Sequence, residues 1–361
     1  MTLRYSMSRV RGRGAGLGNE LIPWARSFLA AQIVNARALS PAFGMNSRRY
    51  WRHFGTPRHD WLLHRALEQV LPVVEFTESD YLRYGSGDFV DAFRTFADDK
   101  KLHTRGSYVL VTEGMWGGYR HIAEARDFIF STLYQSRYAA RNLLRIAQRL
   151  DRSKLIVAMH VRMGDFGAAR QTVTDYRGKF NVSLPLLWYR NIAQSIRSSL
   201  GSDVQFLIIS DGTAEQLQPL LDGLPAVTTS DIADSDCSDL LALASADLLV
   251  CSVSSFSTTA VFLSEAPYLW FEPQLQQHEE GFYSIWGNEP AQQLPDGATR
   301  QALDSKVLMD QSDSGRGVPV GLDGNVPEAL LRSLVAQKAA RHIDGDLVRY
   351  GVVRINRAGQ P

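Results

Sequence analysis

The chain has 361 residues, of which 45% are hydrophobic and 21% are charged. This composition supports a buried core and excludes an intrinsically disordered chain, and the length predicts two domains at roughly 100–200 residues each. With 39 Lys and Arg against 38 Asp and Glu, the net charge is +1, which gives no support to nucleic acid as a partner. Two cysteines, Cys237 and Cys251, are too few for a disulfide framework or a zinc site.

The sequence begins without the apolar core of a signal peptide, and no apolar run reaches the roughly 18 residues that a membrane span needs. We therefore expect a cytoplasmic protein with no transmembrane segment. The early histidines are His53, His59, His64 and His103. They do not stand at metal-ligand spacing with carboxylates, so no metal site is predicted.

Residues 1–152 are predicted to form a first domain. It opens with a short strand over residues 3–11, a glycine-rich turn over 12–18, and a long helix over 19–38, where apolar residues recur at helical spacing. The other elements expected in this domain are a helix at 61–70, a short buried strand at 109–111, and a helical region at 122–150.

The polar stretch 151–154 marks the expected boundary, and a second domain follows over residues 153–275. Here strands and helices alternate in the rhythm of a parallel, Rossmann-like sheet. The strands expected are 155–161, 204–210, 248–252 and 268–271, and the helices are 186–200, 214–221, 238–246 and 255–263. The remaining segment, 276–361, is expected to be irregular to about residue 318 and to end in a helix at 328–341, able to dock back on the first domain.

The most informative feature is the end of the apolar strand 155–161. It carries His160 and is followed at once by Arg162, Gly164 and Asp165. Open α/β sheets bind ligands at the carboxyl ends of their strands, and a planar guanidinium can grip two phosphate oxygens. The pattern therefore predicts a phosphate site at Arg162. An ion pair between Arg162 and Asp165 is equally compatible with these residues.

The glycine-rich turn 12–18 opens a helix, which predicts a backbone close to a ligand. It is not a dinucleotide fingerprint. A glycine triad that starts at Gly12 would need glycine at Leu17, and one that starts at Gly14 would need it at Asn19. A tight turn whose glycines only supply positive φ is the alternative.

Two more strand ends carry polar residues. Hydroxyl groups crowd residues 251–259, and hydroxyls with free amides at a helix start form a phosphate cradle. An N-cap at Ser254 or Ser255 explains the same residues. Asp211 follows the strand 204–210, where it either accepts from a ribose or base or caps the next helix.

Together these segments resemble the fucosyltransferase superfamily, which includes bacterial α-1,2-fucosyltransferases and protein O-fucosyltransferases. Gly14-Ala-Gly-Leu-Gly-Asn19 is similar to the glycine motif of the family, and His160-Val-Arg-Met-Gly-Asp165 resembles its His-x-Arg-Arg-Gly-Asp motif. Asp247-Leu-Leu-Val-Cys-Ser-Val-Ser-Ser-Phe-Ser257 resembles the late strand that ends in Ser-Ser-Phe-Ser, and Ile209-Ser-Asp211 falls where the family often has Ser-Asp. The motifs follow the order of the family over about residues 3–272.

The resemblance implies a GT-B-like glycosyltransferase in which two Rossmann-like domains face a cleft. Residues 1–152 would form the acceptor side, and residues 153–275 would bind the GDP-sugar. The implied reaction is an inverting, metal-independent transfer of fucose from GDP-fucose to a hydroxyl of a glycan or glycoconjugate, with no further cofactor.

The resemblance also implies roles for single residues. Arg162 would hold the β-phosphate and stabilise the departing GDP, and Asn19 would join the catalytic set. An inverting transfer needs a general base, and Asp165 and Asp175 are the nearest carboxylates, neither fixed by spacing. Asp165 is the expected base, with an anchor for Arg162 or His160 as its alternative role. Met163 stands where the motif has a second Arg, as an apolar residue does in the protein O-fucosyltransferases. The donor-binding residues implied are His160, Arg162, Gly16, Gly18, Asn19, Asp211, Ser254, Ser255 and Phe256.

Two alternatives to fucosyl transfer remain open at this point. One is a sugar-nucleotide or glycan-binding protein on the same scaffold that has lost transfer, and the other is a transferase of another GDP-sugar. A nicotinamide-dependent oxidoreductase is disfavoured because the dinucleotide fingerprint fails.

Overall fold

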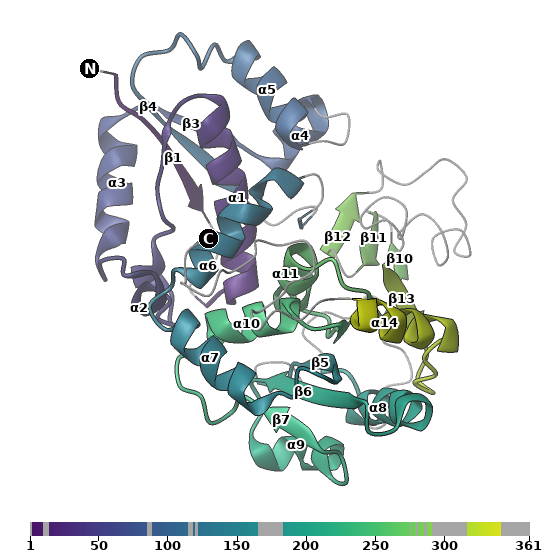
Figure 1. The fold of residues 1–361 in the computed structure, drawn as a ribbon. Coiled ribbons are helices and arrows are strands. Elements are labelled where there is room, and N and C mark those ends of the chain that lie inside the picture. Colours follow the sequence, from purple (N-terminus) through teal and green to yellow (C-terminus); the bar gives the residue numbers. More distant parts are fainter. Residues whose placement is uncertain are drawn as a thin grey trace. The chain divides into compact units, whose positions relative to one another are not determined.

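The computed structural model describes residues 2–9, 14–84, 89–114, 118–119, 122–164, 183–274, 276–278, 281–284, 287–290 and 316–340. Two compact units are present (Figure 1): Met1–Arg137 with Trp286–Asn288, and Tyr138–Ile285 with Glu289–Pro361. The division precedes α7 (Ala139–Arg149), which packs on α10 (Asp236–Ala244) within the second unit. No helix in the described part of the chain is both long and apolar enough to cross a membrane.

The first unit is built on a parallel sheet in the order β2–β1–β4–β3. Its strands are β1 (Arg4–Arg9), β2 (Arg37–Ala38), β3 (Val73–Phe76) and β4 (Tyr108–Glu113). From β1 the chain passes to β2 at one edge of the sheet. It then crosses to β3 at the opposite edge and returns to β4, which lies between β3 and β1. β1 and β4 are therefore the two central strands, and their carboxyl ends lie side by side.

Helices cover this sheet on both faces. Successive residues of β1 point to opposite faces: the Ser6 hydroxyl donates to the Ser27 carbonyl oxygen of α1 at 2.9 Å, and Met7 packs with Val109 and with Leu67 of α3. The helical segments are α1 (Leu17–Ile33), η1 (Phe43–Met45), α2 (Trp51–Phe54), α3 (Asp60–Val70), α4 (Glu78–Tyr84), α5 (Phe89–Asp99), η2 (Ala123–Ala125) and α6 (Arg126–Tyr134).

The second unit has six parallel strands in the order β13–β9–β8–β5–β6–β7. Numbered along the chain from β5, this is the order 3-2-1-4-5-6 of Rossmann folds, with its switch point between β5 and β8. The predicted α/β class with two parallel sheets is therefore confirmed. The strands are β5 (Leu155–Val161), β6 (Val204–Ser210), β7 (Ala226–Thr228), β8 (Leu248–Val250), β9 (Tyr268–Phe271) and β13 (Gly317–Val320).

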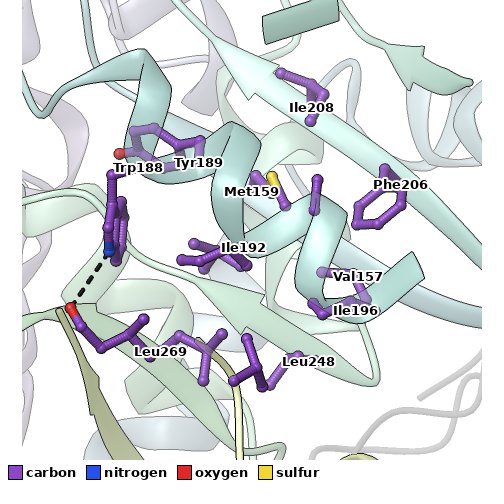
Figure 2. Close-up of a cluster of buried hydrophobic side chains, with 14 of the residues drawn as sticks. Val157, Met159, Trp188, Tyr189, Ile192, Ile196, Phe206, Ile208, Leu248 and Leu269 are labelled. Carbon is purple, nitrogen blue, oxygen red and sulfur yellow. Dashed lines mark hydrogen bonds between the residues drawn. The ribbon is translucent and has the colours of Figure 1, made fainter. Parts of the chain in front are cut away.

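The core of the second unit lies between this sheet and α8 (Leu186–Leu200). Figure 2 shows the apolar side chains of α8 over the strands, and the Trp188 indole donates to the Val320 carbonyl oxygen of β13 at 3.3 Å. Val157 and Met159 of β5 join this core, and so do α9 (Ala214–Leu221) and α14 (Glu328–Ala340). His160, which follows Met159 and points to the opposite face of β5, instead contacts α11 (Ser255–Leu263). Three short strands, β10 (Gln276–His278), β11 (Gly281–Ser284) and β12 (Gly287–Pro290), form a separate sheet, and η3 spans Glu272–Gln274.

Most elements of the second unit lie where the sequence predicts them, whereas two predicted helices of the first part differ. The helix predicted over 19–38 ends at Ile33, because Asn35 adopts a left-handed conformation with φ 50°. The Ala36 amide then donates to the Ala31 carbonyl oxygen at 2.9 Å, which closes the helix end. The region predicted as helical over 122–150 is interrupted after α6, where the Arg137 amide donates to the His53 carbonyl oxygen at 2.8 Å.

The predicted docking of the final helix on the first domain is wrong. Leu331 and Leu334 of α14 belong to the core of the second unit. The Lys338 ammonium lies 2.9 Å from a carboxylate oxygen of Asp247, and the same oxygen accepts the Ile156 amide at 2.8 Å. A buried carboxylate therefore ties α14 to the amino end of β5.

We expect Lys338→Met to lower the free energy of unfolding by about 2 kcal/mol, because it removes an ammonium group from contact with a carboxylate that is only 4% exposed. Urea unfolding followed by circular dichroism measures this loss. The control is Arg332→Met on the same helix, whose partner Glu328 is 71% exposed, and which we expect to leave the midpoint unchanged. Equal losses in the two variants would contradict the role given to Asp247.

Candidate functional site

The end of β5 is held by a carboxylate at the end of β6. One oxygen of Asp211 accepts the backbone amides of Met163 at 2.8 Å and Gly164 at 3.1 Å, and the other accepts from the Arg162 guanidinium. The Arg162 side chain is 15% exposed and that of Asp211 is 32% exposed. Asp211 therefore fixes both the backbone after β5 and the direction of its cation.

The two strand ends approach so closely that both need glycine. A Cβ on Gly164 would lie 2.9 Å from Cγ of Asp211, and one on Gly212 would lie 2.9 Å from Cγ of Met163. A further contact joins the strands, since the Ser210 hydroxyl donates to the Val161 carbonyl oxygen at 2.5 Å. The conformation that presents Arg162 is thus set by the pairing of β5 with β6.

Asp211 is not the cap of the next helix, which was one of its two predicted roles. Thr213 caps α9 instead: its hydroxyl accepts the Gln216 amide at 3.2 Å, and the Gln216 side chain accepts the Thr213 amide at 2.8 Å. This reciprocal arrangement is a capping box. The pattern Thr-x-x-Gln in the sequence is the signal that could have identified it.

His160 links β5 to the neighbouring strand β8. Its Nδ1 lies 2.9 Å from the hydroxyl oxygens of both Ser252 and Ser257, and its ring lies 4.7 Å from that of Phe256. The Tyr189 hydroxyl donates to the His160 carbonyl oxygen at 3.0 Å. These contacts attach the strand that carries Arg162 to the loop before α11.

Burial keeps the His160 imidazole neutral. The ring is only 4% exposed, and this desolvation lowers its pKa to about 3, with the nearby Asp211 charge opposing the shift and the Arg162 charge adding to it. With so low a pKa the imidazole is a weak base at pH 7. His160 therefore positions its neighbours through hydrogen bonds.

The serine-rich segment begins a helix as predicted. Ser254 is the N-cap of α11, and its hydroxyl accepts the Phe256 amide at 3.1 Å. Ser254, Ser255 and Phe256 are all partly exposed. The interpretation of these residues as an N-cap is thus confirmed for Ser254, and their predicted role in binding a donor stays a prediction.

In the first unit the glycine-rich turn leads into α1. Gly16 is the N-cap of this helix, and Gly18 and Asn19 lie in its first turn. Asn46 was not identified from the sequence. Its side-chain amide donates to the Ala15 carbonyl oxygen at 3.0 Å and to Glu20 at 2.7 Å. This contact fixes the turn against the segment after η1.

The structure thus gathers His160, Arg162, Asp211, Ser254 and Phe256 along the carboxyl ends of β8, β5 and β6 in the second unit. Gly16, Gly18 and Asn19 belong to the first unit. Asp165 lies outside the described residues, so its pairing with Arg162 and its role as base stay predictions. Among the described residues, no group of three or more His, Cys, Asp and Glu side chains could hold a metal ion.

No protein-family model matches the sequence, and no curated protein matches it. Solved structures of glycosyltransferases are similar to the chain at low identity. The glycosyl transferase family 9 structure from Veillonella parvula is 10% identical, with a TM-score of 0.40 over 93% of this chain and 97% of that one. POFUT1 in complex with GDP-fucose is 12% identical, with a TM-score of 0.41 over 74% and 97% of the two chains. E. coli heptosyltransferase WaaC with ADP is 10% identical, with a TM-score of 0.37 over 93% and 100%.

We expect the neutral His160 to make the protein less stable in acid. Because its folded pKa of about 3 lies below the ordinary 6.5, the unfolded chain binds an extra proton between these values. The contribution of His160 to the free energy of unfolding is complete above pH 6.5. Between pH 6.5 and 3 it falls by about 1.4 kcal/mol for each unit by which the pH drops. Urea unfolding of wild type and His160→Asn across this pH range measures the effect. We expect the difference between their free energies of unfolding to shrink as the pH falls. His103→Asn, at a half-exposed side chain, is the control that should keep the wild-type slope.

Proposed function

We propose that the chain is an inverting GT-B glycosyltransferase that moves fucose from GDP-fucose to a hydroxyl of a glycan or glycoconjugate. The observation that carries the proposal is Arg162, a cation fixed by Asp211 at the switch point of a Rossmann-ordered sheet. Two residues earlier, His160 contacts the first turn of α11. The second unit thus combines a directed guanidinium with a helix N-terminus, and both groups favour a diphosphate.

The chemistry of glycosyl transfer suits this arrangement. The acceptor oxygen forms a bond to C1 of the sugar while the bond from C1 to the β-phosphate oxygen breaks, and the electron pair leaves with GDP. Negative charge therefore grows on the diphosphate in the transition state. A cation that is already held in place stabilises that charge without reorganising, so Arg162 acts most strongly where catalysis needs it.

Met163 supports a site with one arginine at this position of the motif. Its side chain is partly buried against the core of the second unit and lies beside Gly212. An apolar side chain packed in this way adds no charge to the diphosphate site. In the proposed reaction, Arg162 and the amides at the start of α11 therefore carry the stabilisation.

Calorimetric titration with GDP and then GDP-fucose tests the proposal. We expect micromolar affinity for GDP that is unchanged by EDTA and falls at least about 30-fold in Arg162→Ala, since a charge-assisted contact contributes about 2 kcal/mol. Arg149→Ala is the matched control. Arg149 also pairs with an aspartate, Asp231, but it lies at the end of α7 and not at the end of β5. We expect it to bind as the wild type does.

Other results of this titration would point elsewhere. Wild type that binds no GDP would overturn the proposal, and a panel of UDP, ADP and NAD would then identify any other nucleotide. Equal affinity for GDP-mannose and GDP-fucose would favour another GDP-sugar as donor. Binding of GDP-fucose without release of GDP in the presence of acceptors would favour a binding protein that has lost transfer.

The close approach of β5 and β6 gives a second prediction for the same site. Gly164→Ala places a methyl group against the Asp211 carboxylate and displaces it from Arg162. We expect about tenfold weaker GDP binding, since the guanidinium loses its orientation while its charge remains. The control is Gly106→Ala, where an added Cβ has nothing within 4 Å. Unchanged affinity in Gly164→Ala would show that Asp211 does not orient Arg162 for the ligand.

A further inference from the structure

Two buried serine hydroxyls of the second unit lie against one nitrogen of the His160 imidazole. We propose that Ser252 and Ser257 keep the single proton of this ring on Nε2, and that the Nε2–H group donates a hydrogen bond to the diphosphate of the nucleotide sugar. This inference rests on the proposed function. It makes the two serines positioning residues, which act on the ligand through His160.

The three polar groups form a closed triangle. Nδ1 of His160 lies 2.9 Å from the hydroxyl oxygens of both Ser252 and Ser257, and the two oxygens lie 3.3 Å apart. The Ser257 oxygen also accepts the Ser252 backbone amide at 3.0 Å. His160 is 4% exposed, Ser252 is 3% exposed and Ser257 is fully buried. In the described part of the chain, the hydroxyl hydrogens therefore have acceptors only within the triangle.

The count of donors and acceptors assigns the ring proton. Each hydroxyl has one hydrogen to donate, and an unprotonated Nδ1 has one lone pair to accept it. With Nδ1 unprotonated, one serine donates to Nδ1 and the other donates to the first, so both hydrogens are bonded. With Nδ1 protonated, the hydroxyls can donate only to each other, and one hydrogen is left without an acceptor. A buried donor without an acceptor is destabilising, so the triangle favours the proton on Nε2.

The position of the proton matters because the ring is neutral. Burial lowers the pKa of His160 to about 3, so at pH 7 the ring carries a single N–H group. A proton on Nδ1 would leave a lone pair on Nε2, and a lone pair repels a phosphate oxygen. A proton on Nε2 makes the same atom a hydrogen-bond donor.

Nε2 is available to a ligand, whereas Nδ1 is not. Among the described residues, Nδ1 has two hydrogen-bond partners and Nε2 has none. Nε2 also does not belong to the fully enclosed polar atoms without a partner, so it reaches the surface of the described structure. Because an imidazole carries its two nitrogens on opposite sides, Nε2 points away from the serine pair. The network thus ends in an N–H group that a bound acceptor would satisfy.

The surroundings of the ring favour an anionic acceptor. Arg162 follows two residues later, and its charge acts on the His160 ring. Phe256, in the first turn of α11, lies 4.7 Å from the ring. A guanidinium and a helix N-terminus both favour phosphate oxygens. The carboxylate of Asp211 also acts on the ring, but its hydrogen bonds come from Arg162 and from two backbone amides.

Nitrogen NMR of protein labelled in its histidine rings tests the tautomer directly, because the protonated and unprotonated nitrogens of a neutral ring have well-separated shifts. The His160 signals are those that His160→Phe lacks. We expect wild type without ligand to show Nε2–H at pH 7. Ser252→Ala and Ser257→Ala should each keep this tautomer, because either hydroxyl alone can donate to Nδ1. The double variant should show a mixture of both tautomers.

Calorimetric titration with GDP tests the contact with the diphosphate. His160→Phe keeps an aromatic ring without an N–H group, and we expect it to bind GDP at least about tenfold more weakly. His160→Gln, whose amide supplies a donor, should recover part of this loss. The single serine variants should bind as wild type does. We expect the double serine variant to bind about fivefold more weakly, since the ring loses both its fixed tautomer and its fixed orientation.

The matched control is a buried serine pair of the first unit. The hydroxyl oxygens of Ser6 and Ser27 lie 3.0 Å apart, and both residues are fully buried. We expect Ser6→Ala combined with Ser27→Ala to lower the melting temperature and to leave GDP affinity unchanged. Melting temperatures of all variants show that each one is folded.

The outcomes separate this inference from the proposed function. Wild type with its proton on Nδ1 would overturn the inference, and so would single serine variants that each lose as much affinity as the double variant. If Arg162→Ala loses GDP while His160→Phe binds it as wild type does, Nε2–H does not meet the diphosphate and the proposed function stands. If wild type binds no GDP, the proposed function fails and the ligand assigned to Nε2 fails with it.

Discussion

The candidate site depends on one carboxylate that receives three donors. Asp211 accepts the amides of Met163 and Gly164 and the guanidinium of Arg162, and in doing so it converts the end of a strand into a fixed platform. An arginine on a flexible turn would lose side-chain entropy each time it met a phosphate. Here that entropy is lost on folding, and the core of the second unit supplies the free energy. The same arrangement restricts position 164 to glycine, because a Cβ there would clash with the Asp211 carboxylate.

The platform in turn depends on the packing beneath it. The pairing of β5 with β6 places Val161 beside Ser210, so the residues that follow each strand must meet. Residues of β5 alternate between a purely apolar face, packed on α8, and a face where His160 contacts α11. The neutral imidazole is essential to that second face. A charged ring in its place would be desolvated among serine hydroxyls and an aromatic ring, at a cost of several kcal/mol.

The local elements followed from the sequence, whereas the contacts between them did not. The helix at Leu186–Leu200 and the strand at Leu155–Val161 have apolar patterns long enough to fix their type. The strand Gly317–Val320 does not, because four residues that include Gly and Pro carry no periodicity, and it forms only by pairing with β9. Contacts within the site could not be predicted either, because they join residues that are far apart in the sequence. The motif indicated Arg162, but its partner Asp211 stands 49 residues away, and only the pairing of β5 with β6 brings them together.

The two units hold carboxyl groups with partners of different kinds. In the proposed reaction a departing diphosphate needs a positive charge that is already in place, and Asp211 holds the Arg162 guanidinium for that purpose. In the first unit, burial raises the pKa of Glu20 to about 7, and the hydrogen bond from the Asn46 amide opposes that shift. The partner of Asp211 is thus a charged guanidinium, whereas the partner of Glu20 is a neutral amide.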